Sequence, residues 1–246
     1  MVNVAIRFAG TLAERWLLPP TCIVCGDGTA QARHRALDLC HECADDFPHN
    51  LFACLRCGEP LPANSPRDIE CGRCLKKPPR YDRAFCAFRY DYPVDHLIRA
   101  LKFHGRLPYG RVLGELFAGT VARTRSTPWP EMMIPVPLAA ARFRARGFNQ
   151  AIEIGRTIER RLGIPLRADI AVRIRDTREQ AGLDRKERRK NLRGAFAVAE
   201  KLAAKHIAIL DDVITTGSTA NELARTLRRA GATLIEVWAV ARTGKR

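Results

Sequence analysis

The second half of the chain alternates between short apolar runs and longer segments whose apolar residues recur at helical spacing. Residues 207–210 are apolar at every position, which is typical of a central parallel strand covered by helices on both faces. Residues 234–240 are almost as apolar, and the segment 220–227 between these runs has apolar positions at helical spacing, closed by Gly231. This order predicts a strand, a helix and a second, parallel strand.

The same alternation extends back to about residue 80. Strands are predicted near residues 84–90, 132–136, 170–174, 206–211 and 233–241. Helices are predicted near residues 94–104, 109–125 and 148–162. With 246 residues, 46% of them hydrophobic, the chain can bury one core and carry a smaller appendage. We therefore expect the α/β fold class, with an open and mainly parallel sheet.

The first 74 residues contain eight of the nine cysteines, arranged as four Cys-x-x-Cys pairs. The pairs are Cys22 with Cys25, Cys40 with Cys43, Cys54 with Cys57, and Cys71 with Cys74. Each pair places two thiolates on one side of a tight knuckle, and two knuckles supply the four soft ligands that tetrahedral zinc prefers. Gly26, Gly58 and Gly72 follow cysteines of these pairs, where the backbone turns sharply. The spacing predicts two structural Zn²⁺ sites, which we assign to adjacent pairs, although it also permits the pairs to interleave.

Disulfide bonds, or a redox-active pair, are the alternatives to metal at these cysteines. Residues 1–20 have apolar positions, but Arg7, Glu14 and Arg15 interrupt any signal-peptide core, so a short amphipathic helix is predicted there. No apolar run in the sequence approaches the roughly 18 residues that span a bilayer. We therefore expect a cytoplasmic protein without a transmembrane segment, whose thiols bind metal because the cytoplasm is reducing. A site of four thiolates has no open coordination position, so its zinc is expected to be structural.

A proline-stiffened stretch at residues 76–79, Lys-Lys-Pro-Pro, follows the last cysteine pair and suits a linker. It divides the chain into an N-terminal helix with a double zinc-ribbon module, residues 1–80, and an α/β domain, residues 81–246. Cys86 lies alone in the apolar run 84–88 and is predicted to be a buried strand residue.

Two acids and a hydroxyl-rich turn follow the central apolar strand. The acids are Asp211 and Asp212, and the turn consists of Thr215, Thr216, Gly217, Ser218 and Thr219. Ligands of open α/β sheets bind beyond the carboxyl ends of the strands, and free N–H groups at a helix N-terminus bind phosphate. A capping box of Thr219 and Glu222 is the simpler explanation of the hydroxyls, but it leaves the acids unexplained. Two carboxylates beside a phosphate repel it unless they bind sugar hydroxyls or Mg²⁺, so a ribose-phosphate site is predicted.

The charge of the chain is strongly positive, with 42 lysines and arginines against 26 aspartates and glutamates, a formal net charge of +16. This excess predicts a polyanionic ligand or partner, although it does not distinguish phosphates from nucleic acid or an anionic surface. Neither a Walker-type motif nor a Gly-x-Gly-x-x-Gly motif is present, which argues against the commonest nucleotide sites. Three tryptophans and four tyrosines are few for an extensive platform on which bases stack.

Residues 209–219 resemble the signature with which type I phosphoribosyltransferases bind 5-phosphoribosyl 1-pyrophosphate (PRPP). By that resemblance, Asp211 and Asp212 face the 2′- and 3′-hydroxyls of the ribose, and the turn after them holds the 5′-phosphate. Two further stretches, with the cysteine module, extend the resemblance over essentially the whole chain and narrow it to the ComF-like family, of the competence protein F and GntX type. The residues of these stretches are Pro135 to Leu138, Arg142, Arg144, Arg146 to Gln150, Arg178, Gln180, Gly182, Leu183, Arg188, Asn191 and Gly194 to Phe196.

This resemblance implies a type I phosphoribosyltransferase-like sheet behind a zinc-ribbon module, with PRPP and Mg²⁺ as ligands. Arg142 and Arg146 are the candidates for binding the pyrophosphate, because guanidinium groups bind phosphate oxygens bidentately. Each of them is equally well explained as part of a solvated surface. The highly charged segment 184–193 is expected to be an exposed lid. No catalytic residue is assigned, because no side chain stands out as a base for an incoming nucleophile.

Two functions compete under this resemblance. The first is that of a PRPP-binding protein of natural competence, which handles single-stranded DNA and contacts the DNA-uptake machinery. The second is that of an active phosphoribosyltransferase, in which an amine or base displaces Mg-pyrophosphate from PRPP. As in type I relatives, a homodimer is expected.

Overall fold

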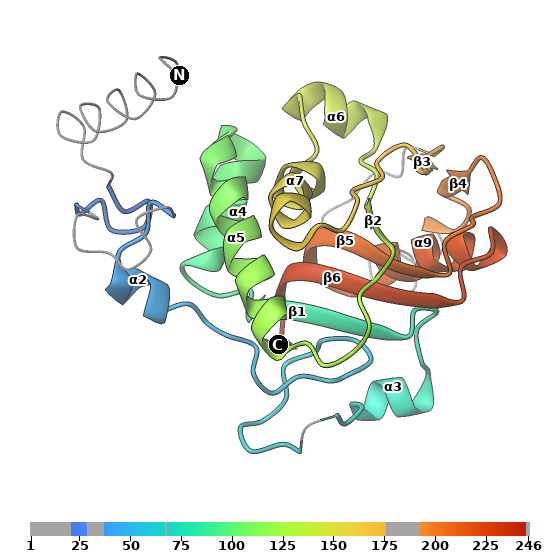
Figure 1. The fold of residues 1–246 in the computed structure, drawn as a ribbon, viewed down its shortest axis with the longest axis horizontal. Helices are drawn as coiled ribbons and strands as arrows, with labels where there is room; N and C mark the ends of the chain where they lie inside the picture. The colour runs from blue at the N-terminus through green and yellow to red at the C-terminus, as the bar shows by residue number, and fades with distance from the viewer. Residues whose placement is uncertain (1–20, 29–36, 67, 176–191, 245–246) are drawn as a thin grey trace, which may run out of the picture. The chain divides into compact units, whose positions relative to one another are not determined.

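The chain forms two compact units, residues 1–47 and 48–246 (Figure 1). The computed structural model describes residues 21–28, 37–66, 68–175 and 192–244. The N-terminal helix expected within residues 1–20 lies outside the described residues, and so does the expected lid except for its last two residues. The domain boundary near residue 80 stays a prediction.

A four-stranded parallel sheet forms the centre of the larger unit. Its strands are β1 (Arg83–Arg89), β2 (Met132–Pro135), β5 (His206–Ile214) and β6 (Leu234–Arg242). Their order across the sheet is β1-β6-β5-β2, and all three pairings are parallel. The two most apolar strands, β5 and β6, are therefore the inner ones, because only inner strands are covered by packing on both faces and both edges. The predicted open and mainly parallel α/β sheet is confirmed.

A second, small sheet pairs β3 (Ala171–Arg173) with β4 (Phe196–Val198) in antiparallel fashion. The short β4 was not predicted from the sequence, because three residues are too few to establish an alternating pattern. The segment expected near 170–174 is confirmed as β3.

Helices cover both faces of the parallel sheet (Figure 1). The described helices of the larger unit are α3 (Gly72–Lys76), α4 (Val94–His104), α5 (Leu107–Thr124), α6 (Ala140–Arg146), α7 (Gln150–Leu162) and α9 (Ser218–Arg229). The smaller unit contributes α2 (His41–Asp45). Among these described helices, none has the length and apolar character needed to cross a bilayer.

The alternation of side chains along β5 shows how the two helical layers attach. Ile207 and Ile209 belong to the same buried cluster as Leu223 of α9. Leu210 points the other way, where a Cβ built on Gly155 of α7 would lie only 2.8 Å from its Cδ2 atom. Successive residues of a strand face opposite sides of the sheet, so α7 and α9 pack on opposite faces. The glycine lets α7 approach the sheet closely.

Two features of the helices differ from what the sequence predicts. Helix α6 was not expected, and it has no buried residue, so it lacks the apolar periodicity by which helices are recognised. The capping box of Thr219 and Glu222 is wrong, because α9 begins at Ser218 with Gly217 as its N-cap. Glu222 instead accepts a hydrogen bond from the backbone N–H of Gly194 at 2.6 Å and pairs with Arg225.

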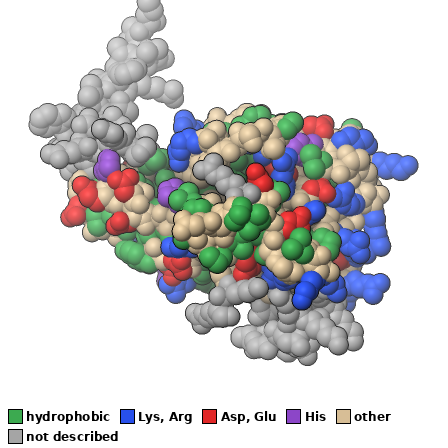
Figure 2. Space-filling model, turned by 90° about the horizontal axis from the view of Figure 1, so that it is seen from below, with side chains coloured by type: hydrophobic (Ala, Val, Ile, Leu, Met, Phe, Trp, Pro, Cys, Tyr) green, Lys and Arg blue, Asp and Glu red, His purple; other side chains and the backbone are tan. Residues whose placement is uncertain are grey.

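Positive charge is unevenly distributed over the surface. Figure 2 views the molecule from below. Lysine and arginine side chains gather at its right side, which is the side where β4 and α9 lie in Figure 1. The last turn of α9 itself carries Arg228 and Arg229.

A buried carboxylate joins three strands at the amino end of the sheet. Glu236 of β6 is 1% exposed and accepts hydrogen bonds from both terminal nitrogens of Arg125, each at 2.8 Å. Arg83 of β1 and His206 of β5 lie 2.7 and 2.8 Å from its Oε1, and the Trp238 indole donates to Oε2. Burial alone would raise the pKa of Glu236, but these donors, above all Arg125, lower that pKa to about 2.

Glu236 should make the larger unit sensitive to acid. Its folded-state pKa of about 2 lies below the ordinary value of 4.5, so its contribution to stability is complete above the ordinary value and is lost as the pH falls towards 2. The difference corresponds to about 3 kcal/mol of unfolding free energy. Urea unfolding between about pH 7 and about pH 3 should therefore show a flatter pH dependence for Glu236→Gln than for the wild type.

The surface pair of Glu115 and Arg161 supplies the control, since Glu115→Gln removes a carboxylate whose arginine partner is exposed. That variant should keep the pH dependence of the wild type. Parallel stability curves for the wild type and Glu236→Gln would contradict the assignment.

Candidate functional site

The hydroxyl-rich turn joins β5 to α9 at the carboxyl end of the sheet, as the sequence predicts. Gly217 is the N-cap of α9 with φ of 74°, a left-handed conformation that favours glycine. Thr216 Oγ1 donates to Ser218 Oγ at 2.9 Å and accepts a bond from the Ser218 N–H at 3.3 Å. The N-cap Gly217 makes no side-chain cap bond, and Thr216 accepts only the N–H of Ser218, so the next N–H groups of the first turn remain available to a ligand.

Asp212 is held by side chains from α4 and α7. It is 2% exposed, and one carboxylate oxygen forms an ion pair with the ammonium group of Lys102 on α4. The other oxygen accepts a hydrogen bond from Nε2 of Gln150, the first residue of α7, at 3.0 Å. Lys102 was not singled out from the sequence, because nothing near it in the chain indicates that its partner is Asp212.

The two adjacent acids have different electrostatic environments. Burial, and then the negative charge of Asp212, raise the pKa of Asp211 well above its ordinary value. Burial also acts to raise the pKa of Asp212, but the charge and hydrogen bond of Lys102 outweigh it and lower that pKa. Asp212 is therefore the ionised member of the pair, and Asp211 holds a proton far more readily than an ordinary aspartate.

The two candidate arginines lie on α6, which follows β2 at the same end of the sheet. Arg146 donates to Oε1 of Gln150, and its guanidinium carbon lies 5.8 Å from the centre of the Phe103 ring on α4. The structure thus joins Arg146 to Asp212 through one glutamine. Arg142 lies one turn earlier on α6 and is partly buried.

Several residues of the family resemblance are not placed. Arg178, Gln180, Gly182, Leu183, Arg188 and Asn191 lie outside the described residues. Gly194, Ala195 and Phe196 are described, and they lead into β4.

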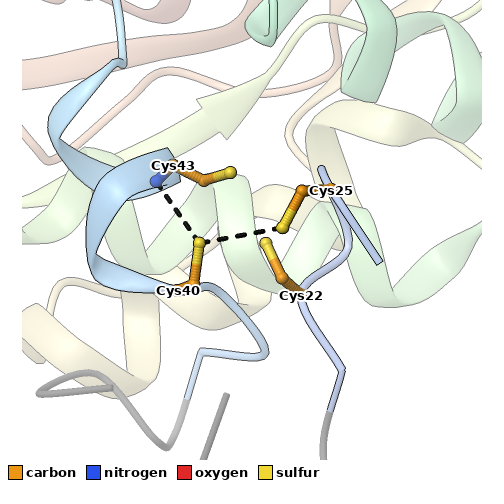
Figure 3. A group of neighbouring side chains, drawn as sticks. All are labelled: Cys22, Cys25, Cys40 and Cys43. Atoms are coloured by element: carbon orange, nitrogen blue, oxygen red, sulfur yellow. Dashed lines mark hydrogen bonds between the residues drawn. The ribbon is translucent and has the colours of Figure 1, made fainter. Parts of the chain in front are cut away.

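Four cysteines of the smaller unit form the first metal-binding group. Cys22, Cys25, Cys40 and Cys43 point their sulfur atoms toward one another (Figure 3), and these atoms all lie within 4.8 Å of one another. The Cys43 N–H donates to Cys40 Sγ at 3.4 Å at the start of α2.

The second group, in the larger unit, is fully buried. Cys54, Cys57, Cys71 and Cys74 also place their sulfur atoms within 4.8 Å of one another. Gly58 has φ of 66°, and a Cβ there would lie 2.6 Å from Cys86 Sγ, so a side chain cannot be accommodated at the knuckle. Cys86 itself is a buried residue of β1, as predicted. All nine cysteines are free of disulfide bonds, and the metal ligands come from adjacent pairs rather than interleaved ones.

One buried arginine joins the second cysteine group to the hydroxyl-rich turn. Arg242, the last residue of β6, is 1% exposed, and its Nε donates to the carbonyl of Cys57 at 3.1 Å. Another nitrogen donates to the carbonyls of Ile214, at 3.0 Å, and of Thr215, the first residue of the turn. The third nitrogen pairs with the buried carboxylate of Glu59. The Arg242 guanidinium group therefore ties the second cysteine knuckle to the base of the turn.

Comparisons with known proteins identify similar sequences for both the cysteine-rich part and most of the chain. A family model described as a double zinc ribbon domain matches residues 13–75. The chain is 36% identical to Competence protein F of Haemophilus influenzae over 227 residues, which cover 90% of this chain and 96% of that protein. It is 35% identical to the DNA utilization protein YhgH of Escherichia coli strain K12 over 208 residues, which cover 83% of this chain and 90% of that protein.

A solved structure is also similar, that of a purine phosphoribosyltransferase from Pyrococcus horikoshii. The match has a TM-score of 0.31 and 16% sequence identity, and it covers 53% of this chain and 79% of that one. The double zinc ribbon match and the geometry of the cysteines confirm the two predicted four-cysteine zinc-binding sites.

The two zinc sites should contribute differently to stability. Cys22→Ser and Cys54→Ser should each reduce the zinc content of the purified protein from two ions to one, because each removes one ligand of a closed site. Only Cys54→Ser should also destabilise the parallel sheet, since Arg242 binds the knuckle that this site holds. Zinc content by mass spectrometry and thermal unfolding followed by circular dichroism measure the two effects. Equal unfolding midpoints for the two variants would contradict the distinction.

Proposed function

The chain belongs to the ComF-like family of competence protein F and the YhgH DNA utilization proteins, and from this membership we propose that it binds PRPP at the turn between β5 and α9 and handles single-stranded DNA during natural competence in the cytoplasm. The observation that supports the proposal is the acid pair beside a helix N-terminus whose N-cap, Gly217, has no side chain. A phosphate accounts for the helix N-terminus and a sugar accounts for the acids.

The unequal protonation of the acids suits a ribose. Each hydroxyl group both donates and accepts hydrogen bonds, so a diol is complemented by one acceptor and one donor. Ionised Asp212 supplies the acceptor, and Asp211 with its raised pKa supplies the donor. Lys102 removes the need for a second cation at Asp212, because it already neutralises that carboxylate.

The pyrophosphate of PRPP would lie toward α6. Arg146 is held by Gln150, which also bonds Asp212, so this arginine is tied to the ribose-binding acids. Its guanidinium group can bind phosphate oxygens bidentately. Both carboxylate oxygens of Asp212 already have protein partners, so we propose that Mg²⁺ arrives with the pyrophosphate oxygens rather than on this carboxylate.

Single-stranded DNA would bind beside this site, along α6 and the end of α4. Phe103 is 70% exposed and Phe143 is 49% exposed, so both rings are accessible to a base. Arg144 and Arg146 lie within a turn of Phe143 on α6. Exposed rings on which bases stack, interleaved with cations that contact phosphates, are the features of a single-strand interface. Phenylalanines thus supply the platform that the few tryptophans and tyrosines do not.

Phosphoribosyl transfer to an amine or a base is the alternative function of the same site. It would release pyrophosphate from PRPP when an acceptor is added, whereas binding alone would not. Screening of amines and nucleobases for pyrophosphate release separates the two functions.

The assignment of the acids predicts the effect of Asp211→Ala on PRPP binding. Alanine leaves no buried charge without a partner, so the variant should fold like the wild type. It removes the hydroxyl donor of the acid, and we expect the affinity for PRPP with Mg²⁺ to fall about tenfold, as for the loss of one good hydrogen bond. Isothermal titration calorimetry measures this. Asp169→Asn, at an exposed acid paired with Arg167, is the control and should bind as the wild type does. Equal affinities for all three proteins would refute the PRPP site.

The DNA interface predicts a loss of affinity in Phe103→Ala. Removal of one stacking ring should weaken the binding of a labelled single strand about tenfold, measured by fluorescence anisotropy. Tyr92 lies just before the first residue of α4, at the end far from Phe103, and is 67% exposed. Tyr92→Leu removes this ring and should leave the affinity unchanged. Arg144→Met should reduce the slope of the logarithm of affinity against the logarithm of salt concentration by about 0.7. Equal effects of Phe103→Ala and Tyr92→Leu would place the DNA elsewhere.

A further inference from the structure

A pocket of about 280 Å³ lies between the second cysteine knuckle and the turn that begins α9. One wall is the turn, with Thr216 and Ser218, and the other wall comes from residues 73–81. Among the described residues that line the pocket, none is an aspartate or a glutamate. The pocket therefore combines the positive end of a helix with a lining that lacks acidic side chains.

Two cations lie in the second wall. Lys77 is exposed at the pocket, and Arg73 lies beside it with its guanidinium 3.1 Å from Glu59 Oε2 and 3.4 Å from Cys57 Sγ. Arg73 thus offsets the negative charge of the buried thiolate and carboxylate behind the wall. The positive charge of Lys77 lies at the pocket, and the N-terminus of α9 lies at the same pocket.

A buried hydroxyl opens into the same pocket. Tyr81 is 2% exposed and lines the pocket, and its hydroxyl forms no hydrogen bond with any described residue. A Cβ built on Gly217 would lie 3.1 Å from this oxygen, so the phenol reaches the turn itself. A phenol at neutral pH is a donor, and this one, at the pocket surface of a buried side chain, has no acceptor among the described residues. An anion in the pocket would supply that acceptor.

The two walls are held in place from behind. Arg242 bonds the carbonyl of Cys57 on one side and that of Ile214 on the other. In addition, Asn221 of α9 accepts a hydrogen bond from the N–H of Arg80 at 2.7 Å. A site whose walls are already fixed loses little conformational freedom when a ligand binds.

We propose that this pocket receives the 5′-phosphate of the ligand, with the Lys77 ammonium and the Tyr81 hydroxyl acting as donors opposite the N–H groups of α9. The inference rests on the proposed function and deepens it, because it assigns part of the phosphate site to the segment that follows the second cysteine group. The chemistry recognised is that of a ribose or deoxyribose 5′-phosphate. Two sources carry such a group: PRPP, and the 5′-phosphorylated end of a single DNA strand.

The test compares Lys77→Met and Tyr81→Phe with Lys76→Met in the full-length zinc-loaded protein. Lys76 is the exposed neighbouring lysine and does not line the pocket, and Tyr81→Phe removes only the hydroxyl. Ribose 5-phosphate is the probe, with ribose as the ligand that lacks the phosphate. Lys77→Met and Tyr81→Phe should each weaken ribose 5-phosphate about tenfold, as for the loss of one charge-assisted hydrogen bond, and Lys76→Met should not. Zinc content and circular dichroism verify the fold of each variant.

The outcomes separate this inference from the proposed function. If Asp211→Ala weakens PRPP but Lys77→Met and Tyr81→Phe bind ribose 5-phosphate as the wild type does, the pocket is wrong and the PRPP site stands. If neither PRPP nor ribose 5-phosphate binds the wild type, the PRPP site is wrong, and DNA ends decide the pocket. A 5′-phosphorylated strand should then bind more tightly than a 5′-hydroxyl strand, and Lys77→Met should abolish that difference. Equal binding of both strands to the wild type in that case would overturn the pocket as well.

Discussion

The guanidinium of Arg242 is the contact on which the arrangement of the larger unit depends. A single buried cation satisfies carbonyls of a cysteine knuckle, carbonyls at the base of the hydroxyl-rich turn, and the carboxylate of Glu59. Arginine suits this position because its planar group offers five donors in fixed directions and keeps its charge when buried. A buried ion pair of this kind adds little net stability compared with apolar packing, but it specifies one arrangement, since removal of either partner leaves an uncompensated charge. The second cysteine knuckle and the sheet are therefore joined through hydrogen bonds and an ion pair to one guanidinium group.

The fold gives the two identical side chains of the acid pair different electrostatic environments. Asp211 and Asp212 are adjacent in sequence, yet only Asp212 faces the ammonium group of Lys102 on the opposite helical layer. Their carboxyl groups are hydrogen-bonded to each other, but the ion pair with Lys102 belongs to Asp212, so their surroundings differ although their chemistry does not. A carboxyl group with a raised pKa beside one with a lowered pKa makes a site that is less negative than two ordinary aspartates. Such a site tolerates an anionic ligand in a way that two ionised acids do not.

The sequence predicts those features whose causes are local. Helix α4 was expected near residues 94–104 and occupies Val94–His104, because its apolar periodicity and the glycine after it lie within one short segment. The cysteine groups were equally predictable, since the ligand spacing within each knuckle is a property of a few residues. Helix α6 was missed because it packs no apolar face. Lys102, Tyr81 and Arg242 were missed because their partners lie far away in the chain, and neither pattern nor spacing contains that information.

The separation between Arg242 and its partners has a consequence for the order in which the molecule is completed. Glu59 and Cys57 precede Arg242 by 183 and 185 residues, so the ribosome makes the second knuckle long before it makes the strand that anchors it. Contacts between residues so distant in sequence form late, because a long loop must close before they are gained. A nascent chain would thus complete its metal-binding knuckles first and its central sheet last. Until β6 has been synthesised, the carboxylate of Glu59 can pair with Arg73 but not with Arg242, so the second knuckle is complete before it is anchored to the sheet.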